Sequence, residues 1–100
     1  MFQVKWDGVR AICHQAKDGN QIFHRKGSEI THLYPEIAQY AFTQPRKDVL
    51  LDGELIVLGV DNRPHFPSIL RRERAKRPET VRSFTYSLPV VYMVFDLLEG

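Results

Sequence analysis

The segment from Lys5 to Arg10, with glycine at position 8, holds the residues best suited to covalent chemistry. Gly8 allows a tight backbone turn and the close approach of a ligand, so the Lys5 amine can point into a cleft. Arg10 follows within reach, and its guanidinium suits phosphate or ribose oxygens. The pattern predicts a lysine nucleophile beside an arginine that binds a phosphorylated ligand.

A lysine nucleophile must lose its proton before it attacks. At an unperturbed pKa near 10.4, roughly one amine in a thousand is neutral at about pH 7.4. Nearby positive groups, a metal ion or burial could lower that pKa. A lysine beside a turn is usually only a surface residue, so the interpretation needs support from the rest of the chain.

Asp52 and Glu54 give the first support, because they stand in an otherwise apolar run. In a strand, alternation places both carboxylates on one face with Leu50 and Ile56. Buried carboxylates are costly unless they are paired or face a polar cleft. The functional interpretation is an acceptor for a sugar hydroxyl or a metal ligand, and the alternative is a strand end that emerges into solvent.

Phe95, followed by Asp96, gives the second support. Strict alternation would place its ring with Val91, Met93 and Leu97, which is typical of a core aromatic. The alternative is a platform on which a base stacks, an interaction worth roughly 1–3 kcal/mol.

Residues 71–82 are strongly basic, with six arginines and lysines against two glutamates, although the net charge of the chain is only +2. A local basic stretch suits a phosphate backbone. The alternative is a solvated helix and loop.

The elements that must position these residues follow from periodicity and turn signals. A short strand is expected before Lys5, and a hairpin at Asp18-Gly19. The longer strands are expected from Val9 to Ala16, Gln21 to Arg25, Val49 to Leu58 and Val90 to Leu98.

Two helices are expected between the strands. The first follows Pro35 and carries the apolar stripe Ile37, Ala38, Ala41 and Phe42 until Pro45 ends it, and the second begins at Phe66. Residues 76–88 are expected to form a loop. The order β-β-β-α-β-α-β predicts an α+β fold with a largely antiparallel sheet and two helices.

Composition narrows the function classes. A chain of 100 residues, 43% hydrophobic and 26% charged, is typical of one small globular domain. No apolar run is long enough to span a membrane, and the start lacks the apolar stretch of a signal peptide, so a reducing cytoplasm is expected. Cys13 alone excludes an internal disulfide, and neither it nor the four histidines show metal-ligand spacing, so no metal ligand is assigned.

Four motifs in order resemble the covalent nucleotidyltransferase superfamily, which comprises DNA ligases, RNA ligases and messenger-RNA capping enzymes. They are Lys-x-Asp-Gly-x-Arg from Lys5, Arg-x-Gly from Arg25, Asp-Gly-Glu from Asp52 and Phe-Asp at Phe95. The chain looks most like ATP-dependent DNA ligases of bacterial double-strand-break repair and recombination. The resemblance covers essentially the whole chain and implies a partial nucleotidyltransferase domain, an ATP-grasp-like ligase fold.

The resemblance implies a three-step reaction: a lysine attacks the α-phosphate of ATP, AMP passes to the 5′-phosphate of a nick, and the 3′-hydroxyl displaces AMP. Carried over, Lys5 is the nucleophile and Glu54 hydrogen-bonds the ribose. Arg10 would bind ribose or phosphate, Arg25 would hold a phosphate, and Phe95 would stack on adenine.

Two further residues of the first motif receive roles from the resemblance. Gln3 stands where related ligases often carry a glutamate that accepts a hydrogen bond from the adenine amino group, and a glutamine carbonyl can also accept it. Asp7 would hold the turn of the motif rather than transfer a proton.

The resemblance also implies ATP and Mg²⁺ as cofactors, with most metal ligands outside this chain. Nicked duplex DNA is the expected substrate, a Ku-type end-joining factor a partner, and the bacterial cytoplasm at the nucleoid the location, with no membrane. Residues 1–100 would be a partial adenylation domain. The later glutamate and lysine motifs and the OB-fold domain are expected to be absent, so little activity is expected of the chain alone.

Two alternatives stay open at this point. An RNA-capping guanylyltransferase or an RNA ligase shares Lys-x-Asp-Gly and often Asp-Gly-Glu. A non-catalytic nucleic-acid-binding remnant would use residues 71–82 and ignore nucleotides.

Overall fold

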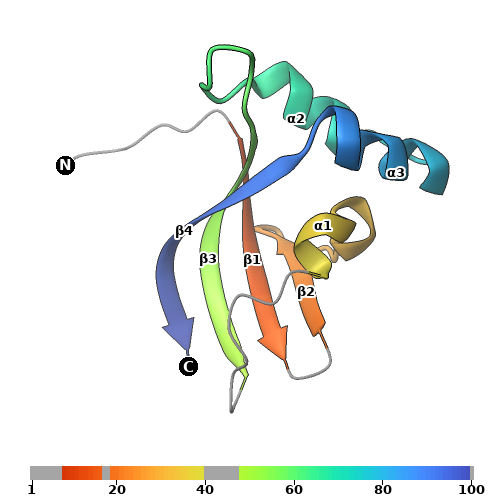
Figure 1. The fold of residues 1–100 in the computed structure, drawn as a ribbon. Coiled ribbons are helices and arrows are strands. Elements are labelled where there is room, and N and C mark those ends of the chain that lie inside the picture. Colours follow the sequence, from red (N-terminus) through yellow and green to blue (C-terminus); the bar gives the residue numbers. More distant parts are fainter. Residues whose placement is uncertain (1–7, 17–18, 40–47, 100) are drawn as a thin grey trace.

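A single antiparallel sheet forms the centre of the fold (Figure 1). The computed structural model describes residues 8–16, 19–39 and 48–99. Within them the strand order is β2-β1-β3-β4, and every neighbouring pair is antiparallel. The strands are β1 (Val9–Ala16), β2 (Gly19–His24), β3 (Val49–Val57) and β4 (Val90–Glu99). The expected α+β fold with an antiparallel sheet is confirmed, whereas the short strand expected before Lys5 lies outside the described residues.

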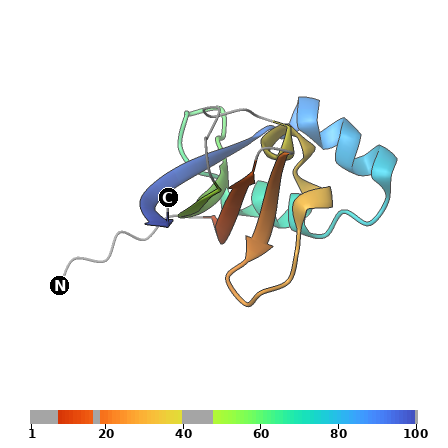
Figure 2. The same ribbon diagram turned by 90° about the horizontal axis from the view of Figure 1, so that it is seen from below.

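The β1–β2 hairpin follows from the Asp-Gly signal. Ala16 pairs with Gly19, whose φ of 135° lies in the region that favours glycine. Asp18 itself lies outside the described residues. Figure 2 shows how strongly the sheet twists between β2 and β4.

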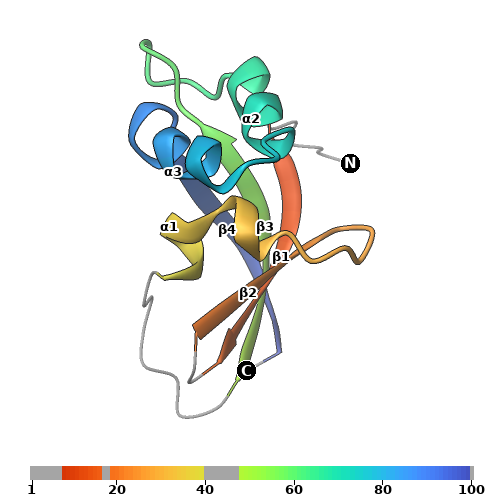
Figure 3. The ribbon, with the colours of Figure 1, turned by 90° about the vertical axis from the view of Figure 1, so that its right-hand side faces the viewer.

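The helices gather along one side of the sheet (Figure 3). They are the 3₁₀ turn η1 (Thr31–Leu33) and the α-helices α1 (Pro35–Ala38), α2 (Phe66–Glu73) and α3 (Pro78–Ser87). Each α-helix has proline in its first turn, where the missing N–H costs nothing. The core between helices and sheet is formed by Ala11, Cys13, Ile22, Leu33, Tyr34, Ile37, Leu55, Val57, Ile69, Val81 and Tyr92.

The loop expected at residues 76–88 was wrong, because α3 spans most of it. Val81, Phe84 and Leu88 recur at helical spacing on the side of α3 that packs on the core. Val81 is its buried residue, and the Phe84 ring lies 5.2 Å from the Arg71 guanidinium. The described residues therefore contain three α-helices instead of two. The expected stripe residues Ala41 and Phe42 lie outside the described residues.

Arg72 fits neither interpretation of the basic stretch at residues 71–82, because its side chain is fully buried. Its guanidinium donates to both carboxylate oxygens of Glu36, at 2.5 and 2.8 Å. It also donates to the carbonyls of Leu33 and Leu88, at 2.8 and 2.9 Å. One side chain thus ties α2 to α1 and to the approach to β4.

Cys13 is expected to resist alkylation in the folded chain. Its side chain is fully buried on β1, and burial raises the pKa of the thiol to about 11. Because the thiolate is the nucleophile, iodoacetamide at pH 8 should label the native chain at least tenfold more slowly than the chain in guanidinium. Mass spectrometry of timed samples measures both rates, and equal rates would show that Cys13 is accessible.

Candidate active site

A row of polar residues crosses the face of the sheet that the helices leave uncovered. Arg10 on β1 pairs with Glu54 on β3, and Glu54 pairs with Met93 on β4. Arg25 stands one residue beyond His24, the last residue of β2, which pairs with Ala11. The register therefore brings together two of the predicted site residues, Arg10 and Glu54, and Arg25 follows in the turn after β2.

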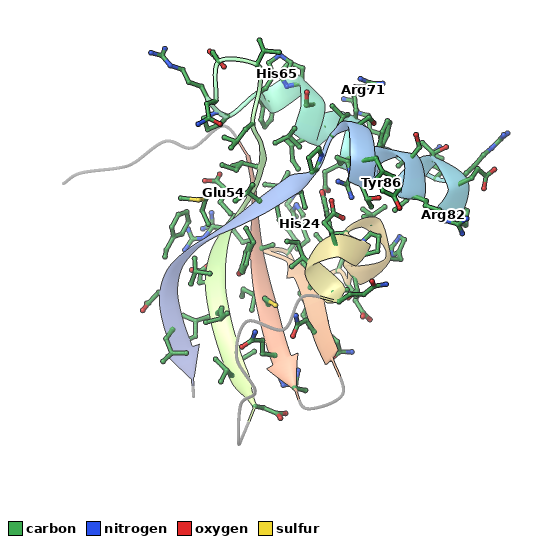
Figure 4. The ribbon with its side chains drawn as sticks, viewed as in Figure 1. His24, Glu54, His65, Arg71, Arg82 and Tyr86 are labelled. Carbon is green, nitrogen blue, oxygen red and sulfur yellow. The ribbon has the colours of Figure 1, made fainter. Side chains whose placement is uncertain are left out.

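Glu54 is almost buried within this row, with 9% of its surface exposed. The alternative of a strand end emerging into solvent is wrong for this position, because β3 continues for three residues past Glu54 and all of them are buried. Figure 4 shows Glu54 where β3 and β4 run together. A carboxylate kept in such surroundings is consistent with a binding role.

Arg10 is held by the carboxylate of Asp52, for which we expected a sugar hydroxyl or a metal ion as partner. Its Nε and Nη2 donate to Asp52 Oδ1 and Oδ2 at 3.2 and 2.6 Å. The hydrogen bond and the charge of Asp52 raise the pKa of Arg10, so the guanidinium is a permanent cation. Asp52 pairs with Ile12, so the contact runs diagonally across two strands. The contact between Arg10 and Asp52 can be predicted only once the register of β1 and β3 is known.

Gly8 lies directly against β3 at the level of Glu54. A Cβ at Gly8 would lie 2.4 Å from the Leu55 carbonyl oxygen and 2.6 Å from Ile56 Cγ2. It would also lie 3.1 Å from Glu54 Cγ. Glycine is thus required by close approach, as the motif suggests. The predicted nucleophile Lys5 and the predicted adenine contact Gln3 lie outside the described residues.

Phe95 lies in an irregular part of β4. Gly53 pairs with Val94 and Asp52 with Asp96, so Phe95 is the extra residue of a bulge. The ring is 45% exposed, which rules out the core-aromatic alternative. The bulge also overturns the expectation that Val91, Met93, Phe95 and Leu97 share one face. Met93 pairs with Glu54, whereas Leu97 pairs with Leu51, which lies on the opposite face, because the extra residue inverts the alternation.

Arg25 occupies an exposed turn at the end of β2. The His24 N–H donates to the Ser28 carbonyl, and the Gly27 N–H to the His24 carbonyl, both at 2.7 Å. Gly27 has a φ of 103°, a value that favours glycine. The Arg-x-Gly motif therefore presents an accessible cation on a turn with defined geometry.

Metal-ligating side chains do not gather in groups of three or more within the part of the chain that the structure describes. None of the helices in this part is long and apolar enough to cross a membrane.

Comparison with known proteins shows the family to which the chain belongs. The family model described as "ATP dependent DNA ligase domain" matches residues 1–100. The chain belongs to the ATP-dependent DNA ligase domain family. The DNA ligase interpretation is thereby favoured over the capping-enzyme alternative.

Proteins similar to this ligase-family chain include an end-joining protein and a DNA ligase. The chain is 33% identical to the bifunctional non-homologous end joining protein LigD of Bacillus subtilis over 98% of this chain. It is 35% identical to a DNA ligase of Methanosphaerula palustris over 96% of this chain. The chain spans 17% of the length of each of these relatives.

A solved structure supports the ligase fold. The structure of mycobacterial DNA ligase D complexed with ATP and MES matches with a TM-score of 0.71 and 28% identity. The match covers 97% of this chain and 28% of that one.

Asp52→Asn is expected to weaken ATP binding by the ligase-family chain through Arg10, since the amide loses one of the two acceptors that hold the guanidinium. If Asp52 acts through Arg10, the effects of Asp52→Asn and Arg10→Ala on the ATP dissociation constant should not add. Titration of the two single variants and the double variant with ATP measures the coupling. Strictly additive effects would show that Asp52 acts independently of Arg10.

Proposed function

We propose that this chain carries the nucleotide-binding part of a DNA ligase adenylation domain, in which Lys5 becomes linked to AMP. The Lys5 amine attacks the α-phosphorus of ATP, a P–N bond forms, and the bond to the pyrophosphate oxygen breaks. The observation that carries the proposal is the polar row of Arg10 and Glu54 against which Gly8 is pressed. It would bind ATP next to the lysine motif.

Chain length supports the approach of Lys5 to this row. Two residues lie between Lys5 and Gly8, so three residue steps join them, and an extended chain advances about 3.3–3.6 Å per step. The amine can therefore act within about 11 Å of Gly8, plus the length of its own side chain. Arg25 would oppose a positive charge on Lys5 and lower the pKa of its amine, whereas the charge of Arg10 is offset by Asp52.

The other residues of the row supply binding groups. Glu54 would accept a hydrogen bond from a ribose hydroxyl, and Arg10, oriented by Asp52, would bind ribose or phosphate. Arg25 would hold a phosphate at the β2 edge of the row. Phe95 offers an exposed ring for adenine, and Gln3 would accept a hydrogen bond from the adenine amino group.

The later steps are proposed from the names of the relatives. AMP would pass from Lys5 to the 5′-phosphate of nicked duplex DNA, and the 3′-hydroxyl would then displace it. The name of the Bacillus subtilis relative places that protein in non-homologous end joining. We extend to this chain a role in bacterial DNA repair and recombination at the nucleoid, with a Ku-type protein as partner.

Mg²⁺ is proposed as the cation that accompanies ATP. In the described part of the chain no three His, Cys, Asp or Glu side chains gather as metal ligands, so the phosphates of ATP would supply part of its coordination.

The proposal is tested by ATP binding and by covalent labelling. In ¹⁵N-labelled protein, millimolar ATP should shift the amide resonances around Arg10, Glu54 and Phe95. Radiolabelled ATP should give a low level of covalent label that Lys5→Ala removes. GTP in parallel separates ligation from capping. Shifts confined to residues of α3, or none at all, would contradict the proposed nucleotide site.

A further inference from the structure

The structure divides the basic stretch of residues 71–82 into parts with different roles. Arg72 is buried, and Arg71 covers the Phe84 ring at 5.2 Å. Three other cations line a groove of about 650 Å³ between α1 and α3: Lys76, Arg77 and Arg82. The sequence alone does not distinguish the buried arginine and the arginine on the ring from the cations of the groove.

The lining of this groove is cationic and rich in hydrogen-bond donors. Polar side chains of His32, Gln39, Thr85 and Tyr86 also line it. Among the described residues of the lining, Glu36 supplies the only carboxylate, and it accepts hydrogen bonds from the buried Arg72 and from the Val90 N–H. The described part of the lining therefore keeps an excess of positive charge from Lys76, Arg77 and Arg82.

Tyr86 adds an aromatic surface to the groove. It is 84% exposed, an unusual state for a large ring on a helix that packs on a core. It stands one helical turn beyond Arg82, and Figure 4 shows both on the side of α3 that looks towards α1. A ring beside cations is suited to sugar and base surfaces next to phosphates.

The groove is separate from the polar row of Arg10 and Glu54. The row lies on the face of the sheet opposite the core, whereas α1 and α3 lie on the helix-covered face. A ligand in the groove would therefore leave the nucleotide site open.

We propose that the α1–α3 groove binds a DNA strand, with Lys76, Arg77 and Arg82 on its phosphates and Tyr86 against a sugar or base. The choice of DNA rests on the proposed function and on charge complementarity, because a strand offers a regular series of anions to cations spread along one groove. The groove is then a second DNA contact, remote from the reacting phosphate, which holds the duplex beside the nick.

The test compares charge reversals inside and outside the groove. Arg77→Glu with Arg82→Glu removes two groove cations, and Arg63→Glu with Arg74→Glu makes the same charge change at exposed positions outside the lining. Fluorescence anisotropy of nicked duplex DNA across a salt series gives affinity and slope. The groove variant should lose at least tenfold in affinity and reduce the salt slope by about 2, since each phosphate contact contributes about 0.9. The outer variant should change the slope by less than about 1.

Further measurements identify the occupant. Tyr86→Ala should weaken DNA binding several-fold more than Tyr86→Phe does. Equal losses in the groove and outer variants would overturn the proposal, as would tighter binding of poly-glutamate than of DNA. ATP-induced amide shifts should persist in the groove variant. If ATP causes no amide shifts but DNA binding depends on the groove cations, only the proposed function is contradicted. If ATP causes the shifts but DNA binding does not depend on the groove cations, only this inference is contradicted.

Discussion

Replacing Arg72 with alanine is expected to lower the free energy of unfolding by about 3–5 kcal/mol, the range for breaking a buried ion pair from one side. The guanidinium is fully buried and holds the Glu36 carboxylate as well as the Leu33 and Leu88 carbonyls. All of these acceptors lose a donor at once. Urea denaturation followed by circular dichroism measures the loss.

Arg74→Ala is the matched control, because Arg74 follows α2 directly and is exposed. It should change stability by less than about 0.5 kcal/mol. Burial of Glu36 opposes ionisation, but the hydrogen bonds and charge of Arg72 outweigh it and lower the pKa of Glu36. This stabilisation is present above the ordinary glutamate pKa and is lost as the pH falls through the lowered value. Equal losses in both variants, or no loss on acidification, would contradict the assigned role of the pair.

Glu54→Ala is expected to weaken ATP binding about 10- to 150-fold, corresponding to the roughly 1.5–3 kcal/mol of a hydrogen bond to a charged group. The carboxylate is nearly buried in the polar row, so water could replace it only poorly as an acceptor for the ribose. The dissociation constant follows from amide shifts during titration with ATP.

Glu54→Gln and Glu79→Ala are the controls for this loss. Glutamine keeps an acceptor oxygen and should retain part of the affinity, whereas Glu79 is exposed on α3 and should not affect it. Thermal unfolding of each variant shows whether the fold survives. A folded Glu54→Ala variant that binds ATP as tightly as the parent would remove Glu54 from the site.

Local sequence signals predicted the sheet and the shared face of the carboxylates at positions 52 and 54. Alternation from Val9 and the carboxylates at positions 52 and 54 determine which side chains share a face, and the Asp-Gly signal gives the hairpin. Once β1 and β3 are paired, Arg10 and Glu54 meet directly. The role of Gly8 also follows, because close approach is one of the few reasons for glycine at such a position.

Features that depend on distant partners could not be predicted. Nothing in the run of arginines distinguishes Arg72, which is buried only because Glu36 lies 36 positions earlier in the sequence. The bulge at Phe95 breaks the alternation that the apolar run predicts. The helix α3 is different, because Val81, Phe84 and Leu88 recur at helical spacing and only the polar residues between them favoured a loop.

The strand order has a consequence for how the chain acquires its structure. β1 pairs with β3, which comes more than thirty residues later, and the Tyr92 hydroxyl donates to the Ala11 carbonyl across 81 positions. Such non-local pairing means high contact order, and proteins of this kind fold in milliseconds to seconds rather than microseconds. On the ribosome, β1 and β2 emerge long before β3, which pairs with β1. The four-stranded sheet can form completely only after β4 has been synthesised.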